Sequence, residues 1–495
     1  MTQMLDQRSD RLTLDRRAGA PLVLAVGVGI AALLGLVVVD GNLKALLICL
    51  GIAFLTLGAI YPRLILYVVL GLVACLSQTT YGVHGQGVFR LGGYILNPVR
   101  LNLQEILIYA LFGILVARRA AGREPLDVPR WVTVPIVLTS LVLLLQLARV
   151  LLGGVRYIDA WVPFNGQYIL AGLVALWCFT ELLAEAQQRL HALDFLYVCA
   201  AGRSIYALIR FFFGSGDTAN AYLTSGVNKV ALWESADHLL FVLLICTAIA
   251  AWATGRVSRG RLALWASGSV FMALTVALSY HRTSWIGLAV AIVLVSILLL
   301  RRSERSIALI PGVVVVLGAI YALSYSRFRT GGSLLTRLFP DVVSQVGSTR
   351  QAEWALAWQT IVHNPIAGEL TARRSASSFA FWDTRVVHNA FLFAWMKLGL
   401  AGLLSLCFLG ASCVVYAIRG VRSRGPEEYI SLAVLGIVPF TLLLAMFETP
   451  LIELRTMVIL AVAGALAVRV AGAPDGNARK RTGHASQRHT VDESE

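Results

Sequence analysis

The chain has 495 residues, of which 58% are hydrophobic, and its mean hydropathy is +0.74. A soluble protein of this length could not bury so much apolar surface, so the composition excludes the soluble classes and predicts a polytopic helical membrane protein. The formal charge of +15 does not indicate a nucleic-acid-binding protein, because the arginines form short clusters between apolar runs and no soluble module presents a basic face with interleaved aromatics.

Apolar runs long enough to cross a bilayer recur along the chain, since a spanning helix needs about 20 apolar residues. The charged first residues lead directly into such a run, which predicts a retained first span. Both termini are expected in the cytoplasm, because the arginine clusters then fall on that side. Twelve or thirteen spans is the alternative count. The fourteen expected spans lie near 21–39, 43–60, 63–78, 103–117, 132–152, 166–183, 194–213, 235–254, 263–280, 283–300, 307–325, 389–417, 428–447 and 453–470.

This topology predicts five parts of the chain. A cytoplasmic tail (1–20) precedes eleven spans (21–325), a large outer loop covers 326–388, three spans cover 389–470, and a polar, disordered cytoplasmic tail covers 471–495. The seven cysteines all lie in apolar runs without metal-ligand spacing, so we expect neither a disulfide framework nor a metal site, and no cofactor.

The outer loop is much longer than most connections and contains aromatics and a helical pattern, so we expect it to fold and to carry function. Its arginines outnumber its acidic residues, which favours an anionic ligand, with binding to lipid headgroups as the alternative. An amphipathic helix is predicted over 348–363, with Trp354 and Trp358 on one face. Arg350 is expected in the first turn of this helix, where the free backbone amides also favour phosphate binding. The acidic residues of the loop are Asp341, Glu353, Glu369 and Asp383.

Two arginines interrupt the seventh apolar run. Arg203 and Arg210 are seven residues apart and therefore share a helix face, and intramembrane arginines usually face a polar cavity. We expect both to bind substrate, together with Glu234 at the start of the next span. The alternatives are an ion pair with Asp194, Glu234 or Asp237, or snorkelling by Arg210.

Two His-Asn pairs flank the second half of the loop. His363-Asn364 precedes a proline, so its expected role is to end the loop helix. His388-Asn389 lies where the loop re-enters the membrane, and Asn389 is expected either to orient the imidazole or to cap the following helix. Lys397, within that helix, is expected to snorkel. The residues expected around one outer cavity, as for a pyrophosphate site, are Arg210, Arg282, Arg350 and His388.

Three stretches together resemble the O-antigen ligase and O-antigen polymerase superfamily of membrane glycosyltransferases. They are SYHRTSWIGL (279–288), with its outer-turn arginine, GSTRQAEWALAWQTIVHNPIAG (347–368), with an arginine before a tryptophan-containing helix, and VVHNAFLFAWMKLGLAG (386–402), with His-Asn before Gly-x-x-Gly. Each stretch alone is weakly specific, whereas their order and spacing are more so. The chain departs from the family pattern at Gly368-Glu369-Leu370, where Gly-x-Gly is common, and at 228–238, where an asparagine-rich motif is usual.

The resemblance implies a metal-independent membrane glycosyltransferase with a GT-C-like fold in the bacterial inner membrane, its site facing the periplasm. Such an enzyme transfers a glycan from a polyprenyl (undecaprenyl) pyrophosphate carrier to an acceptor hydroxyl on a lipid- or carrier-linked glycan, with inversion. By motif, His388 would be the general base or would orient the acceptor, while Arg282 and Arg350 would hold the pyrophosphate. Arg210, Arg203, Glu234 and Asn389 complete the expected site.

Several alternatives stay open. A ligase and a polymerase differ only in the acceptor, which one sequence does not identify. A flippase or transporter of the same pathway fits the number of spans, but transporters tend to have internal repeats and midplane charges. A peptidoglycan-type polymerase would depend on a loop carboxylate such as Asp341 or Asp383. A non-catalytic scaffold would not need arginines inside a span.

Overall fold

The structure is a computed structural model that describes residues 54–76, 101–122, 128–157, 166–213, 235–279, 282–300, 318, 346–370, 387–448 and 450–472. Secondary structure in this part of the chain is helical, with no β-strand. The first expected span, most of the second and all but one residue of the eleventh lie outside these ranges, as do the expected N-terminal tail and all but the first two residues of the expected C-terminal tail.

Eight of the described helices are long and apolar enough to cross a membrane, and two further apolar helices, α3 and α7, are shorter. This agrees with a polytopic all-helical membrane protein. The helices are α3 (Pro62–Cys75), α4 (Leu103–Ala120), α5 (Arg130–Leu152), α7 (Gly166–Leu182), α8 (Ala186–Phe212), α9 (Ser235–Thr254), α10 (Arg259–Leu278), α11 (Arg282–Leu300), α14 (Val346–His363), α15 (Ala390–Ser423), α16 (Glu428–Phe447) and α17 (Leu454–Ala471), with a 3-10 turn, η2, at Pro450–Ile452.

The chain divides into two compact units, 1–68 with 110–124, and 69–109 with 125–495. In the first, Arg118 donates a hydrogen bond from Nη1 to the carbonyl of Ile60 at 3.4 Å. The second contains every described candidate site residue.

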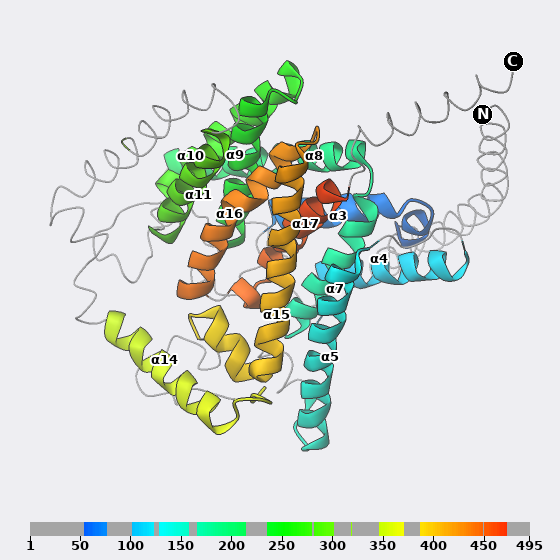
Figure 1. Ribbon diagram of the computed structural model, residues 1–495, viewed down its shortest axis with the longest axis vertical. Coiled ribbons are helices and arrows are strands. Elements are labelled where there is room, and N and C mark those ends of the chain that lie inside the picture. Colours follow the sequence, from blue (N-terminus) through cyan, green and yellow to red (C-terminus); the bar gives the residue numbers. More distant parts are fainter. Residues whose placement is uncertain are drawn as a thin grey trace, which may run out of the picture. The chain divides into compact units, whose positions relative to one another are not determined.

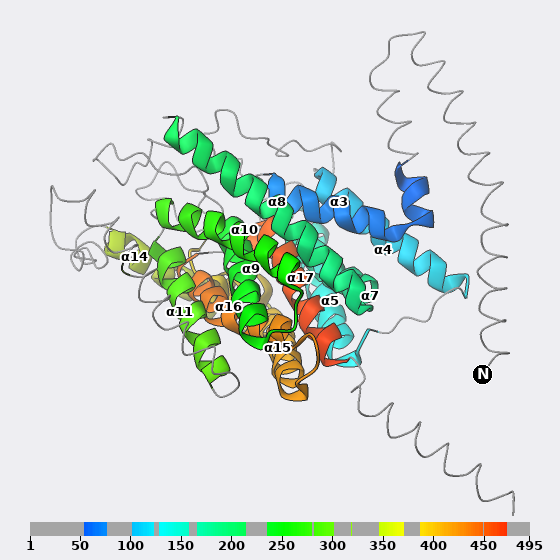
Figure 2. The same cartoon turned by 90° about the horizontal axis from the view of Figure 1, so that it is seen from above.

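Two helices form the interior of the second unit. α9 and α17 are buried along nearly their whole length, as expected of helices that are apolar on every side. α17 packs against α7 and α15, while α16 packs against α9, α11 and α15. Figure 2 shows α16 between α11 and α15. Close packing of α11 on α16 depends on small residues, since a Cβ on Gly287 would overlap the ring of Phe440.

The helix directions define two ends of this bundle. α15, α16 and α17 follow one another through short turns and run antiparallel, so the starts of α15 and α17 lie at the end where α16 finishes. The Ser235 hydroxyl at the start of α9 bonds the Glu448 carboxylate just after α16. We call this the His388 end, because His388 immediately precedes α15. At the opposite end, Arg189 of α8 pairs with Glu427 of the α15–α16 turn.

Candidate functional site

His388 is held by a carboxylate from the loop helix. Its Nδ1 lies 3.0 Å and 3.2 Å from the two carboxylate oxygens of Glu353 on α14. The Glu353 side chain is 3% exposed and that of His388 is 23% exposed. A buried carboxylate on one ring nitrogen selects the tautomer with its proton on Nδ1, so that Nε2 carries the basic lone pair. Figure 1 shows α14 beside the first turns of α15, which explains how residues 35 apart in sequence meet.

Sequence reasoning counted Glu353 only as one of the loop acids and missed this role. Glu353 is buried on the same stripe of α14 as Ala357 and Ile361, at a spacing of four residues. An acid on the apolar stripe of an amphipathic helix was the available signal, because a buried carboxylate needs a polar partner. α14 begins two residues before the expected 348 and ends at the expected His363.

The turn after α14 docks into a break in α15. α15 is interrupted at Gly399, whose φ of 70° and ψ of −176° are non-helical, so the expected continuous twelfth span consists of two helical segments. Gly368 also has a positive φ of 66°, and a Cβ on either glycine would overlap the backbone of the other segment. Both positions therefore require glycine. We call this contact, between residues 365–370 and 395–400, the glycine latch.

Hydrogen bonds across the glycine latch replace those lost at the helix break. The Glu369 amide donates to the Met396 carbonyl at 2.7 Å, and the Leu400 amide donates to the Pro365 carbonyl at 3.0 Å. Such compensation is needed within a membrane protein, where an unpaired backbone group is costly. The latch thus fixes the end of α14 to the start of α15, and with it the distance between Glu353 and His388.

Side chains from two helices complete the glycine latch. Lys397 is 1% exposed and donates to the Leu370 carbonyl at 3.1 Å, so the expectation that it snorkels is wrong. Trp395 donates from Nε1 to the Pro365 carbonyl at 2.8 Å. From α5, Gln146 bonds the Ala367 carbonyl and Arg149 bonds that of Gly368 at 3.3 Å. α5 therefore supports the latch with two polar side chains near its end.

The two His-Asn pairs differ in position and in contacts. The Asn389 Oδ1 accepts a hydrogen bond from the Leu392 amide at 3.0 Å and caps α15, which is one of its two expected roles. Glu353, not Asn389, contacts the imidazole of His388. His363 is exposed and its Nδ1 lies 2.7 Å from the Gln359 carbonyl within α14, in keeping with a role at the helix end.

A second charged cluster lies at the His388 end of the bundle. Asp237, at the start of α9, is 0% exposed and lies between two arginines. Arg203 Nη2 bonds its Oδ2 at 2.8 Å, and Arg455 Nη2 bonds its Oδ1 at 2.6 Å. The arginines also donate to the carbonyls of Cys75 and Val73, at 2.6 Å and 2.8 Å. This geometry favours the ion-pair alternative for Arg203.

The sequence did not lead us to expect that Arg455 pairs with Asp237. It occupies the first turn of the last helix, a place where an arginine at a membrane boundary would be expected to reach outwards. Its side chain instead is 0% exposed. The sequence feature that pointed to this role of Arg455 was Asp237, since buried charges are paired and a buried acid can pair with two arginines.

The structure describes some, but not all, of the other residues that were expected at the site. Arg210 is half-buried in the last turn of α8, with its guanidinium 5.9 Å from the centre of the Tyr206 ring. Arg282 begins α11, which runs antiparallel to α16 and so starts at the His388 end, and Arg350 lies at the start of the second turn of α14, because this helix begins earlier than expected. The side chains of Arg282 and Arg350, and the whole of Glu234, lie outside the described part of the chain.

The comparison with known families concerns the same region. A family model described as O-antigen ligase matches residues 267–407. The match spans α11, α14, the glycine latch and His388 with Glu353, and it contains all three stretches on which the resemblance was based. A comparison with curated proteins finds no match to the chain. The expected resemblance is confirmed over residues 267–407, and this segment of the membrane protein matches the O-antigen ligase family.

Proposed function

We propose that the protein transfers a glycan from a polyprenyl pyrophosphate carrier to an acceptor hydroxyl, at a site facing the periplasm from the bacterial inner membrane. The observation that carries this proposal is the pair of His388 and buried Glu353 inside the O-antigen ligase domain. A histidine with a fixed tautomer is suited to take a proton near neutral pH. The GT-C-like fold and the outer position of loop 326–388 belong to this proposal.

In the proposed reaction, His388 Nε2 takes the proton of the acceptor hydroxyl as its oxygen attacks the anomeric carbon. The bond from that carbon to the pyrophosphate oxygen breaks, and the pyrophosphate leaves with the electron pair. Attack from the opposite face inverts the configuration. Glu353 stabilises the imidazolium that forms, in the way an acid orients the histidine of a catalytic triad. General base catalysis of this kind contributes about 10²–10⁴-fold to the rate.

The pyrophosphate is proposed to bind Arg282 and Arg350. Pyrophosphate is a weakly basic leaving group, so charge stabilisation by preorganised guanidinium groups is more useful than a strong general acid. Arg350 lies at the start of the second turn of α14, so its guanidinium itself is the group proposed to bind the anion. Phosphate binding by arginine makes a metal ion unnecessary, and the proposed mechanism uses none.

A ligase and a polymerase would use the same donor chemistry and differ in acceptor. The experiment that separates them is glycan analysis of the cell envelope in a strain lacking the protein. Loss of all attached glycan, with carrier-linked chains accumulating, identifies a ligase, whereas single attached repeats identify a polymerase. A strain that accumulates carrier-linked glycan on the cytoplasmic side would instead support a flippase, and the proposal would be wrong.

A further inference from the structure

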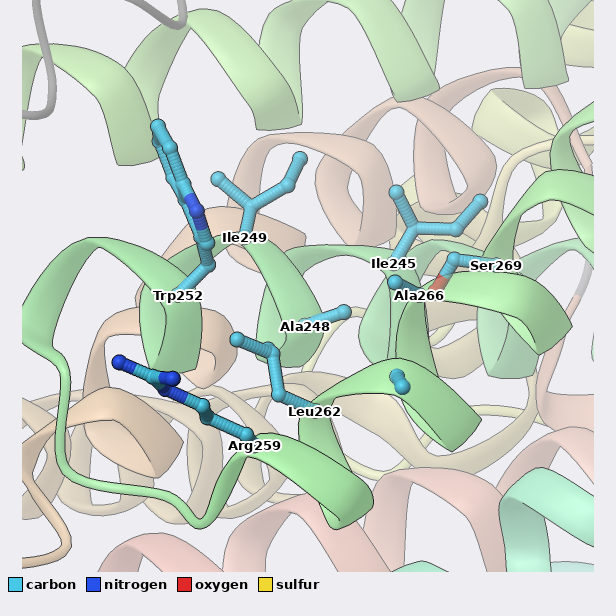
Figure 3. A pocket seen from close by; sticks show the side chains of 9 residues that line it. Ile245, Ala248, Ile249, Trp252, Arg259, Leu262, Ala266 and Ser269 are labelled. Carbon is cyan, nitrogen blue, oxygen red and sulfur yellow. The ribbon is translucent and has the colours of Figure 1, made fainter.

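An open groove lies between α9 and α10, away from the residues discussed above. Its volume is about 480 Å³, within the range of small-molecule sites. Four residues of α9, from Ile245 to Trp252, and five of α10, from Arg259 to Ser269, line it (Figure 3). These are the last turns of α9 and the first of α10, so the groove lies toward the opposite end of α9 from Asp237.

The groove has an apolar floor formed by small side chains. The lining positions on α10 recur every three or four residues, so they form one stripe along the helix. Ala263 and Ala266 on this stripe are exposed, and Ala248 faces them from α9. Both helices are candidate membrane spans, so an open apolar hollow between them is suited to a hydrocarbon chain.

One end of the groove is basic and carries an aromatic residue. Trp252 and the exposed Arg259 lie together at this end (Figure 3). α10 begins here, its preceding Ser258 makes no side-chain cap, and its first turn has no acidic residue. Arg261 of the same turn is committed to Asp194 at 3.0 Å, which leaves Arg259 as the cation of the groove. Arginine with tryptophan at a helix end is typical of the level of lipid headgroups.

The length of the groove selects among hydrocarbon ligands. The lining positions on α10 extend from Arg259 to Ser269, which is about 15 Å of helix at 1.5 Å per residue. Half of a hydrocarbon core of about 30 Å has the same depth. A phospholipid whose phosphate is at Arg259 would therefore place one acyl chain along the whole groove, whereas a polyprenyl chain would extend well beyond it.

We infer that this groove binds an anionic phospholipid of the surrounding bilayer, with its phosphate at Arg259 and one acyl chain over Ala263 and Ala266. The inference is independent of the transfer reaction, since none of these residues belongs to the proposed site. A phosphate diester with a net negative charge complements Arg259, and the start of α10 adds a favourable dipole. A zwitterionic lipid would fill the groove equally well but gain less at Arg259.

The test is native mass spectrometry of the full chain in detergent, titrated with phosphatidylglycerol or with phosphatidylcholine. The wild-type protein should retain phosphatidylglycerol in preference to phosphatidylcholine. Arg259→Gln should reduce that preference about fivefold, because one arginine near a membrane surface contributes on the order of a fivefold gain for an anionic lipid. Arg256→Gln, in the connection between α9 and α10 and outside the groove lining, is the matched control and should behave as wild type.

Ala266→Phe should reduce the retention of both lipids, because the larger side chain fills the groove. Thermal unfolding in detergent checks that the variant is folded, and Ala266→Leu replaces it if it is not. An unchanged preference in Arg259→Gln would overturn the headgroup assignment. Unchanged lipid retention in a folded Ala266 variant would overturn the groove as the binding site. The same result is expected if another segment of this chain fills the groove.

Discussion

Replacing Gly399 with alanine should open the glycine latch while leaving the helix bundle folded. The φ and ψ of Gly399 lie in a region almost restricted to glycine, where another residue is strained by about 1–3 kcal/mol. Its new Cβ would overlap the Ile366 carbonyl, so the segments must separate. The two backbone hydrogen bonds of the latch would then be lost, at about 1 kcal/mol each. The latch should be destabilised by about 3–5 kcal/mol in total.

Hydrogen exchange measured by mass spectrometry reads this change directly. Exchange of the Glu369 and Leu400 amides should accelerate by about 10²- to 4 × 10³-fold, because each 1.4 kcal/mol corresponds to about tenfold in a local opening equilibrium. Gly410→Ala is the matched control in the same helix, since a Cβ there meets nothing within 4 Å. Equal exchange in Gly399→Ala and wild type would refute the reasoning, because a latch that tolerates a Cβ does not need glycine.

Three further outcomes are expected. Glu353→Gln should lower the rate of glycan transfer by about tenfold or more, because the imidazolium of His388 loses its counter-charge; an unchanged rate in a transfer assay would contradict this. Asp237→Asn should destabilise the protein by about 3–5 kcal/mol, because two buried arginines lose their anion. Asp194→Asn, in a more exposed ion pair, is the control and should change stability by less than about 1 kcal/mol. Equal shifts of the two variants in thermal unfolding would be inconsistent with this difference. Transfer by the purified protein should survive EDTA, and its loss on chelation would point to a metal mechanism.

The sequence predicted most of the described helices because charged residues, prolines and glycines delimit the apolar runs. The expected spans 235–254 and 428–447 coincide with α9 and α16, and 283–300 differs from α11 by one residue. The prediction was less accurate for α8, which begins at Ala186 and not near 194. Its polar first turns were excluded by hydropathy, yet Arg189 there is buried because Glu427 pairs with it.

The candidate site was predictable only where local sequence determines geometry. His388 and the end of α14 could be located from the motifs and from Pro365. The partnership of His388 with Glu353 depends on how α14 packs on α15, which no local pattern specifies. The break at Gly399 was missed for the same reason, since the Gly-x-x-Gly pattern does not reveal that the Ile366 carbonyl occupies the space of a Cβ.

The two His-Asn pairs allow a direct test of the central claim, which is that His388 is the base of the transfer. Transfer from a polyprenyl pyrophosphate-linked donor is measured in proteoliposomes for His388→Ala and for His363→Ala, with thermal unfolding as the check on folding. His388→Ala should fold normally and lose at least about 10²-fold in transfer rate, whereas His363→Ala, whose histidine is exposed at the end of α14, should retain most of it. Full transfer by a folded His388→Ala protein would contradict the proposed mechanism.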